Sequence, residues 1–282
     1  MRESSNPVFR SLPKTQGGYA QFGTGAAGYG TQAVHADPYV TQYPEQTQAG
    51  VARPMTIDDV VTKTGVTLAV LTAVGVVSYF IASVNLGLAM PLAMVGALGG
   101  LVLVLVATFG RKQDNPAIVL SYAALEGLFL GAISYLFANV ISNGGYAMIT
   151  QAIIGTLGVF FGMLVVYKTG AIRVTPKFTR MIVAGLFGVL ALMLVNFLAA
   201  MFGVNGGAGL GLRDGGMLAI GFSLLCIGLA AFSFLIDFDA ADQMIRAGAP
   251  EKAAWGVALG LTVTLVWLYI EILRLLSYFN SD

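Results

Sequence analysis

The feature that most constrains this chain is a succession of apolar runs, each about 20 residues long, that starts near residue 58 and continues to the end. A helix of that length spans the hydrocarbon core of a bilayer, where a helix satisfies all its backbone hydrogen bonds internally. Only 10% of the residues are charged and 57% are hydrophobic, which is unlike a soluble domain. The sequence therefore predicts an all-α polytopic membrane protein. Its seven expected transmembrane helices cover residues 60–83, 86–109, 116–140, 149–167, 179–203, 216–238 and 254–278.

The segments between these runs contain Gly, Pro or charged residues, as expected of connections. The break after the first run, SVNLG (83–87), is the weakest. It leaves open a re-entrant pair in place of the first two helices, which would change the helix count.

Residues 1–57 differ in composition from everything that follows. The stretch GGYAQFGTGAAGYGTQ (17–32) is of low complexity, and aliphatic residues are scarce. Such a segment cannot bury enough apolar surface to fold, so we expect a disordered tail. It lacks the apolar stretch of a cleaved signal peptide. The expected organisation is a tail at 1–57 followed by a transmembrane domain at 58–282.

Basic residues fall almost entirely on one side of the expected membrane. If the chain crosses seven times, 13 of its 15 Lys and Arg residues lie on the side of the N-terminal tail. Arg213 falls on the other side, and Arg274 lies within the last run. Since short cytoplasmic loops carry the excess of Lys and Arg, we expect a cell (inner or plasma) membrane protein with a cytoplasmic N-terminus and an outer C-terminus.

Four acidic residues lie in or at the edge of apolar runs: Glu126, Asp237, Asp239 and Glu271. Charges at membrane depth are expensive and are usually functional. Each also has a structural interpretation. The two aspartates could sit at a water-exposed helix end, Glu126 could bond a neighbouring helix, and Glu271 could be neutralised by Arg274 three residues on.

Two carboxyl groups that meet in a low-dielectric setting cannot both ionise easily, so they titrate as a unit nearer physiological pH. Such a pair senses protons. When ionised it also offers the oxygen ligands that Ca²⁺ prefers, although carbonyls and water would have to supply most of the coordination.

Two motifs near the end of the chain, FDAADQMI (238–245) and LYIEILRLL (268–276), resemble the signature of the Bax inhibitor-1/YccA family, also called the transmembrane Bax inhibitor motif family. The opening MRESSNPVF and the stretch ALEGLFLGAIS (124–134) are similar to its bacterial, actinobacterial-type branch. The resemblance covers about residues 58–282.

This resemblance implies a seven-helix fold with the last helix at its centre, and activity as a pH-sensitive Ca²⁺ leak channel. The family's paired aspartates would fall on Asp237 or Asp239 and on Glu271, which would sense protons and line the ion path as tentative Ca²⁺ ligands. Arg274 would restrain Glu271, and Glu126 would help to close the pore. The sequence departs from the family pattern in having Glu for Asp in the last helix, and Ala-Ala after Asp239 where Thr-Gln is usual.

The spacing of the two carboxylates raises a difficulty. With a turn centred near residues 248–250, straight antiparallel helices would leave Asp237 and Glu271 roughly 15 Å apart in depth. Contact requires a turn centred near residue 254. Otherwise the partner of Glu271 is Arg274 or Glu126.

Glycines spaced four apart, which favour close contact between membrane helices, occur at Gly127 and Gly131, Gly158 and Gly162, and Gly256 and Gly260. We interpret all three pairs as packing positions.

Two other functions are compatible with the same residues. A proton-coupled secondary transporter would use Glu271 and Glu126 as relays, and a regulatory or scaffold protein would use the tail to bind partners. The only histidine, His35, lies in the tail, so His-dependent hydrolysis within the membrane is excluded, and we expect no enzyme. We expect the lipid bilayer, Ca²⁺ and protons as partners, no nucleic acid and no resident cofactor.

Overall fold

The computed structural model describes residues 53–142 and 144–280, so the expected disordered tail lies almost wholly outside the described residues. Seven of its helices are long and apolar enough to cross a membrane, and the described residues form no β-strand. These helices are α1 (Ile57–Val84), α2 (Ala89–Phe109), α3 (Pro116–Tyr135), α4 (Gly145–Thr169), α5 (Pro176–Met201), α6 (Met217–Arg246) and α7 (Ala254–Phe279). The described residues also form four short helical turns: η2 (Leu86–Leu88), η3 (Leu136–Ile141), η4 (Val204–Gly207) and η5 (Glu251–Ala253).

The seven helices confirm the fold class predicted from the apolar runs. The weakest break is a real helix end: Asn85 ends α1 in an extended conformation, and its side chain accepts a hydrogen bond from the Gly87 N–H. The largest difference between the expected and the observed helix bounds is at the end of α6, which continues to Arg246, eight residues beyond the apolar run. This extension is polar on its outer side, where Arg246 pairs with Asp242 one turn earlier.

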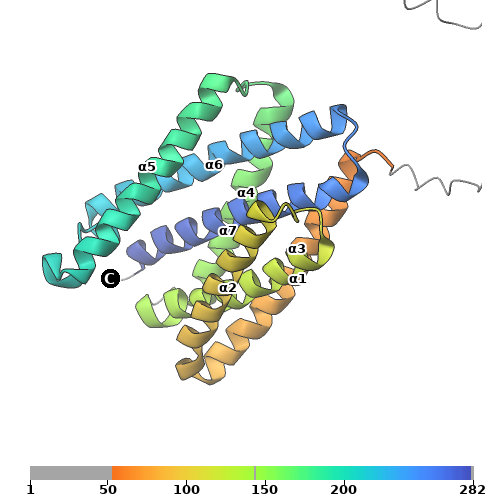
Figure 1. Ribbon diagram of the computed structural model, residues 1–282. Coiled ribbons are helices and arrows are strands. Elements are labelled where there is room, and N and C mark those ends of the chain that lie inside the picture. Colours follow the sequence, from red (N-terminus) through yellow and green to blue (C-terminus); the bar gives the residue numbers. More distant parts are fainter. Residues whose placement is uncertain (1–52, 143, 281–282) are drawn as a thin grey trace, which may run out of the picture. The chain divides into compact units, whose positions relative to one another are not determined.

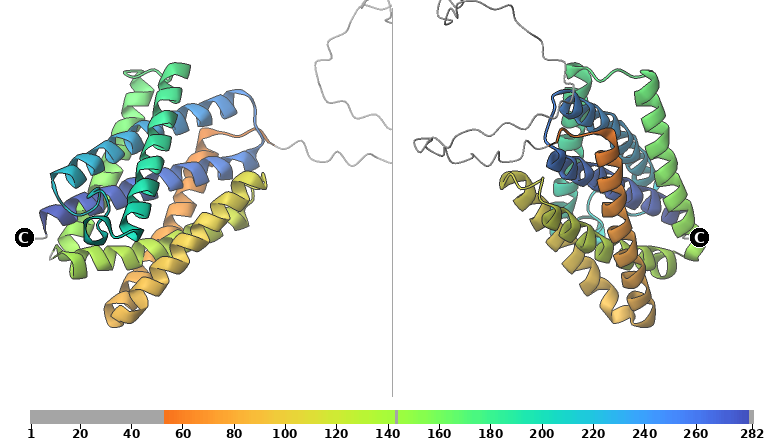
Figure 2. Two further views of the ribbon diagram at one scale, coloured as in Figure 1. Left: turned by 60° about the vertical axis from the view of Figure 1, so that its left-hand side comes forward. Right: turned by 90° about the vertical axis from the view of Figure 1, so that its right-hand side faces the viewer.

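α7 lies at the centre of the helices, as expected. It packs against α6, α1, α4 and α3. Figures 1 and 2 show it between α6 on one side and α1 and α3 on the other. The remaining two helices are peripheral, since α2 packs mainly on α3, and α5 packs on α6. The side chains of α7 are consequently the best placed to be enclosed by protein rather than by lipid.

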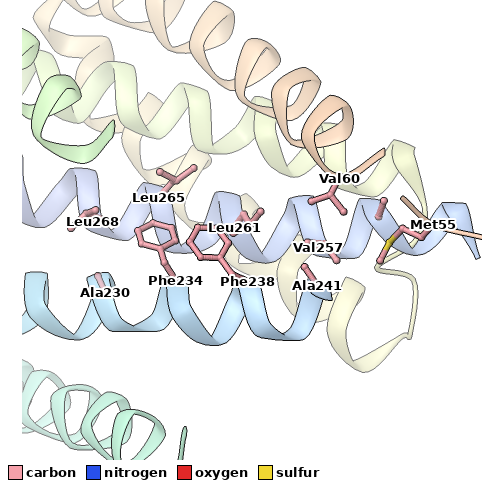
Figure 3. Close-up of a cluster of buried hydrophobic side chains, with 11 residues drawn as sticks. Met55, Val60, Ala230, Phe234, Phe238, Ala241, Val257, Leu261, Leu265 and Leu268 are labelled. Carbon is pink, nitrogen blue, oxygen red and sulfur yellow. The ribbon is translucent and has the colours of Figure 1, made fainter. Parts of the chain in front are cut away.

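A buried apolar cluster joins α6, α7 and the start of α1. In Figure 3, Phe234 and Phe238 of α6 point toward α7 at Leu261 and Leu265. Phe160 of α4 packs edge-on against both phenylalanine rings. This cluster fills the middle of the α6–α7 contact with hydrocarbon.

Only one of the three glycine pairs makes the predicted helix contact. A side chain at Gly127 or Gly131 of α3 would collide with the backbone of α1 at Leu71 and Gly75. Gly158 and Gly162 of α4 have no neighbouring atom within 4 Å of an added Cβ, so the packing prediction is wrong for that pair. It is also wrong for the pair Gly256 and Gly260. An added Cβ at Gly256 would touch Gln113 of the α2–α3 connection and not a helix, and one at Gly260 would meet no atom within 4 Å.

Contacts between connections show that three of them lie at the same end of the protein. We call this end the basic face, because these connections carry Lys and Arg residues. Lys252 before α7 pairs with Asp114 in the α2–α3 connection at 2.8 Å. Tyr167, near the end of α4, donates to Asp242 near the end of α6 at 3.3 Å. The start of α1 joins them, since the Met55 N–H donates to the Ala249 carbonyl. The α2–α3, α4–α5 and α6–α7 connections therefore lie at the same end, and the opposite face carries the other connections and the end of α7.

Candidate functional site

Glu271 on α7 is the most enclosed acidic residue among those described, with 1% of its surface exposed. Both of its carboxylate oxygens accept hydrogen bonds from Arg213, at 2.9 Å each. One oxygen also accepts from Arg274, again at 2.9 Å. A buried carboxylate is thus held by two guanidinium groups, one from its own helix and one from the α5–α6 connection.

The α5–α6 connection folds back toward the helices to bring Arg213 to Glu271. Gly209 and Gly211 adopt positive φ angles of 67° and 76°, which glycine takes without strain. The Leu210 N–H donates to the Asn196 side chain of α5 at 2.8 Å. Leu212 is buried against α5 and α6, and the next residue, Arg213, reaches Glu271 of α7 with its side chain.

Arg213 is firmly held in its charged form. Burial alone would lower the pKa of its guanidinium, but the hydrogen bonds and the negative charge of Glu271 outweigh burial and raise that pKa above its ordinary value. The guanidinium also lies over the Phe222 ring, with 5.1 Å between its central carbon and the ring centroid.

Asp237 on α6 occupies a different position. Its carboxylate accepts a hydrogen bond of 2.7 Å from the Thr264 hydroxyl of α7. It also lines a cavity of ≈ 370 Å³ that reaches the α2–α3 connection on the basic face. The other polar residues lining this cavity are Thr108, Arg111, Gln113 and Asp114. Asp237 therefore binds a neutral hydroxyl and lines a polar cavity, whereas Glu271 binds two positively charged guanidinium groups.

The structure does not bring Asp237 and Glu271 together as a pair. Asp237 and its partner Thr264 lie 13 residues before and 14 residues after Pro250, so the turn is centred there rather than near residue 254. Glu271 is seven residues further along α7, about 10 Å in depth at 1.5 Å per residue. The alternative weighed from the sequence, Glu271 with Arg274, is the contact that forms.

Asp239 and Glu126 lie elsewhere. Asp239 accepts from Gln243 on the next turn of α6 at 2.6 Å and from Tyr167 of α4 at 3.5 Å, close to the basic face. Glu126 on α3 is 8% exposed and faces α2, where a Cβ at Gly100 would come within 2.6 Å of its carboxylate. Neither residue contacts Glu271 through any hydrogen bond or ion pair found among the described residues.

No metal-binding cluster is formed by the part of the chain that the structure describes. No group of three or more His, Cys, Asp or Glu side chains within residues 53–142 and 144–280 is arranged to hold a metal ion. Asp237, Asp239 and Glu271 are thus not gathered as one set of Ca²⁺ ligands.

Two partners were missed at the sequence level. Thr264 is an unremarkable polar residue in an apolar run, and nothing in the sequence marks it. Arg213 did carry a signal: among the described residues, Arg213 and Arg274 are the only two basic residues that the seven-helix topology does not place on the basic face. A lone pair of arginines on the same side as a buried glutamate favours an ion-paired cluster.

Comparison with known proteins supports the fold assignment. A family model described as "Bax inhibitor 1 like" matches residues 6–281, nearly the whole chain. A search among curated proteins gave no match.

Proposed function

Because the chain belongs to the Bax inhibitor 1 like family and is a multi-pass membrane protein, we propose that it is a pH-regulated leak for cations, Ca²⁺ above all, and not an enzyme. The observation that carries the proposal is a pair of cavities on opposite faces. The first lies between α6 and α7 and is lined by Asp237. The second lies beside the end of α7 and is lined by Arg213 and Arg274, which bind the buried carboxylate of Glu271.

The basic-face cavity provides the cation entrance. Of its two acidic lining residues, Asp114 pairs with Lys252, whereas Asp237 has no ion-pair partner among the described residues, only the neutral hydroxyl of Thr264. An ionised carboxylate in such a place attracts a cation, and a proton competes for the same oxygens. Asp237 is therefore the group through which pH acts on cation entry.

In this proposal, the path is closed between the two cavities. Phe234, Leu265 and Leu268 are buried between the level of Asp237 and that of Glu271. Beyond them, Arg213 and Arg274 cover the carboxylate of Glu271. Conduction requires the apolar cluster to part and the arginine cluster to loosen. Glu271 is thus assigned to closing rather than to proton sensing.

Ca²⁺ flux into proteoliposomes across a pH series tests these roles. We expect wild-type flux to vary with pH and Asp237→Asn to flatten that variation. The substitution suits the test, because an amide oxygen still accepts from Thr264 while the charge is lost. Asp58→Asn, at an exposed position on the basic face, is the matched control and should keep the wild-type profile.

The Glu271→Gln variant distinguishes a role in closing the ion path from a role in sensing protons. A neutral amide holds two guanidinium groups less strongly than a carboxylate, so we expect higher flux at every pH with the pH dependence retained. The proposal is contradicted if no Ca²⁺ flux occurs at any pH. It is also contradicted if the flux of Asp237→Asn depends on pH as the flux of the wild type does. Proton flux that appears only with an added solute would favour a proton-coupled transporter instead.

A further inference from the structure

A second cavity, of ≈ 520 Å³, opens on the opposite face beside the end of α7. Called the arginine cavity here, it has five polar lining residues: Asn196, Arg213, Arg274, Ser277 and Tyr278. All five carry hydrogen-bond donors, of which the Ser277 hydroxyl already donates to the Arg274 carbonyl, and no acidic residue lines the cavity. The remaining lining is apolar and comes from η3 and α5.

The charges around the arginine cavity do not balance. Two guanidinium groups share the single carboxylate of Glu271, which leaves one positive charge in excess. Glu271 is buried behind the arginines and does not line the cavity, whereas the arginine side chains are 19% and 20% exposed. An uncompensated charge near membrane depth is costly, so an anion in the cavity would lower the free energy of the cluster.

The arginines are already positioned to receive an anion. Arg213 lies over Phe222 at 5.1 Å, and Arg274 lies over Phe137 at 5.9 Å, measured from the central guanidinium carbon to the ring centroid. Glu271 accepts two N–H groups of Arg213 and one of Arg274. Because a guanidinium carries five N–H groups in a rigid fork, both arginines keep donors that suit the oxygens of a phosphate or carboxylate.

We propose that the arginine cavity binds a compact oxyanion of the phosphate type, held by Arg213 and Arg274, either free in solution or as the headgroup of an anionic lipid. A cavity of this size holds such a group with its water, since one water takes up about 30 Å³ in the liquid. This site is separate from the cation entrance at Asp237 and does not depend on ion conduction.

Thermal unfolding of the purified full chain with inorganic phosphate, at constant ionic strength in an uncharged detergent, is the first test. Binding to the folded state alone should raise the unfolding midpoint by roughly 2–4 °C at a phosphate concentration of about five times the dissociation constant, and by more at higher concentrations. A second arm compares nanodiscs of phosphatidylcholine with nanodiscs that also contain phosphatidylglycerol, without phosphate in the buffer. A shift in detergent identifies a free anion as ligand, and a shift only with phosphatidylglycerol identifies a lipid headgroup.

Two variants remove the site in different ways. Arg274→Gln removes the excess charge and leaves Arg213 and Glu271 as a balanced pair. Ala200→Phe places a ring in the cavity and leaves every charge in place. Arg246→Gln is the control, because Arg246 is an exposed arginine paired with an aspartate on the basic face.

We expect the stabilisation to disappear in Arg274→Gln and Ala200→Phe and to persist in Arg246→Gln. If Arg274→Gln fails to fold, Ala200→Phe alone decides. The proposal is overturned if the wild type shows no shift in either medium, or if the folded cavity variants respond as the wild type does.

Discussion

At the residue scale, Glu271 joins segments that are far apart in the chain. Its carboxylate binds Arg213, 58 residues earlier, and Arg274 on its own helix. Removing one partner of a buried ion pair typically costs about 3–5 kcal/mol, because the other charge stays buried. Loss of Glu271 should therefore release the α5–α6 connection from α7 as well as removing a charge.

The ion pair between Asp114 and Lys252 predicts a modest pH dependence of stability. The hydrogen bond from Lys252, opposed by burial, lowers the pKa of Asp114 below its ordinary value. A lowered folded-state pKa contributes stability above the ordinary value of about 3.9, and this contribution is lost as pH falls through the folded value. The pair is partly exposed, so we expect roughly 0.2–1 kcal/mol.

Thermal unfolding of Asp114→Asn beside the wild type, from neutral pH downward, measures this contribution. The two midpoints should differ at neutral pH and converge in acid, where the wild-type carboxyl is protonated. A difference that stays constant across the series would show that ionisation of Asp114 does not contribute.

At the element scale, the crossing of α1 and α3 depends on glycine. An added Cβ at Gly131 would overlap the Gly75 carbonyl oxygen and approach the Ser78 side chain, and backbone atoms cannot move aside cheaply. We expect Gly131→Ala to destabilise the protein by about 1–3 kcal/mol through overpacking. Unfolding in detergent measures the change.

Gly158→Ala on α4 is the matched control. No atom lies within 4 Å of its added Cβ, so the helix should be unaffected or stabilised by up to about 1 kcal/mol. Equal effects of the two substitutions would show that close packing at Gly131 is unimportant.

α6 and α7 show how the position of a turn decides which residues meet. α6 continues to Arg246, and η5 leads directly into α7, so the hairpin is centred near Pro250. This register places Thr264 beside Asp237 and carries Glu271 two turns further, to the level of Arg213. The two carboxylates therefore have different partners: Asp237 accepts from a hydroxyl, and Glu271 accepts from two guanidinium groups.

At the scale of the whole molecule, the distribution of basic residues predicts the orientation in the membrane. The basic face carries the α2–α3, α4–α5 and α6–α7 connections and should lie in the cytoplasm. Cys226 is the only cysteine and is buried, so Cys226→Ala gives a suitable background for labelling.

In that background, an impermeant maleimide applied to intact cells should label Val204→Cys in the α5–α6 connection. It should label Lys112→Cys in the α2–α3 connection only after the cells are opened. Labelling of Lys112→Cys alone in intact cells would reverse the proposed orientation.

The sequence alone determined the seven helices, the central last helix through its family resemblance, and the identity of the acidic residues at membrane depth. These features can be predicted from sequence because bilayer thickness sets the length of a helix that spans it. In addition, a charge is energetically costly at any position along such a helix. Six of the seven helices end within about five residues of the ends of their apolar runs, and α6 is the exception because its polar end continues past the run.

Only the tertiary structure decided the partners. Asp237 meets Thr264 because the turn is centred near Pro250, and Arg213 reaches Glu271 because a glycine-rich connection folds inward. Both outcomes depend on the path of a connection, which composition and periodicity do not specify. Likewise, equal glycine spacing gave a tight crossing at Gly131 and open surface at Gly158, because a glycine motif favours close approach but does not select the helix that approaches.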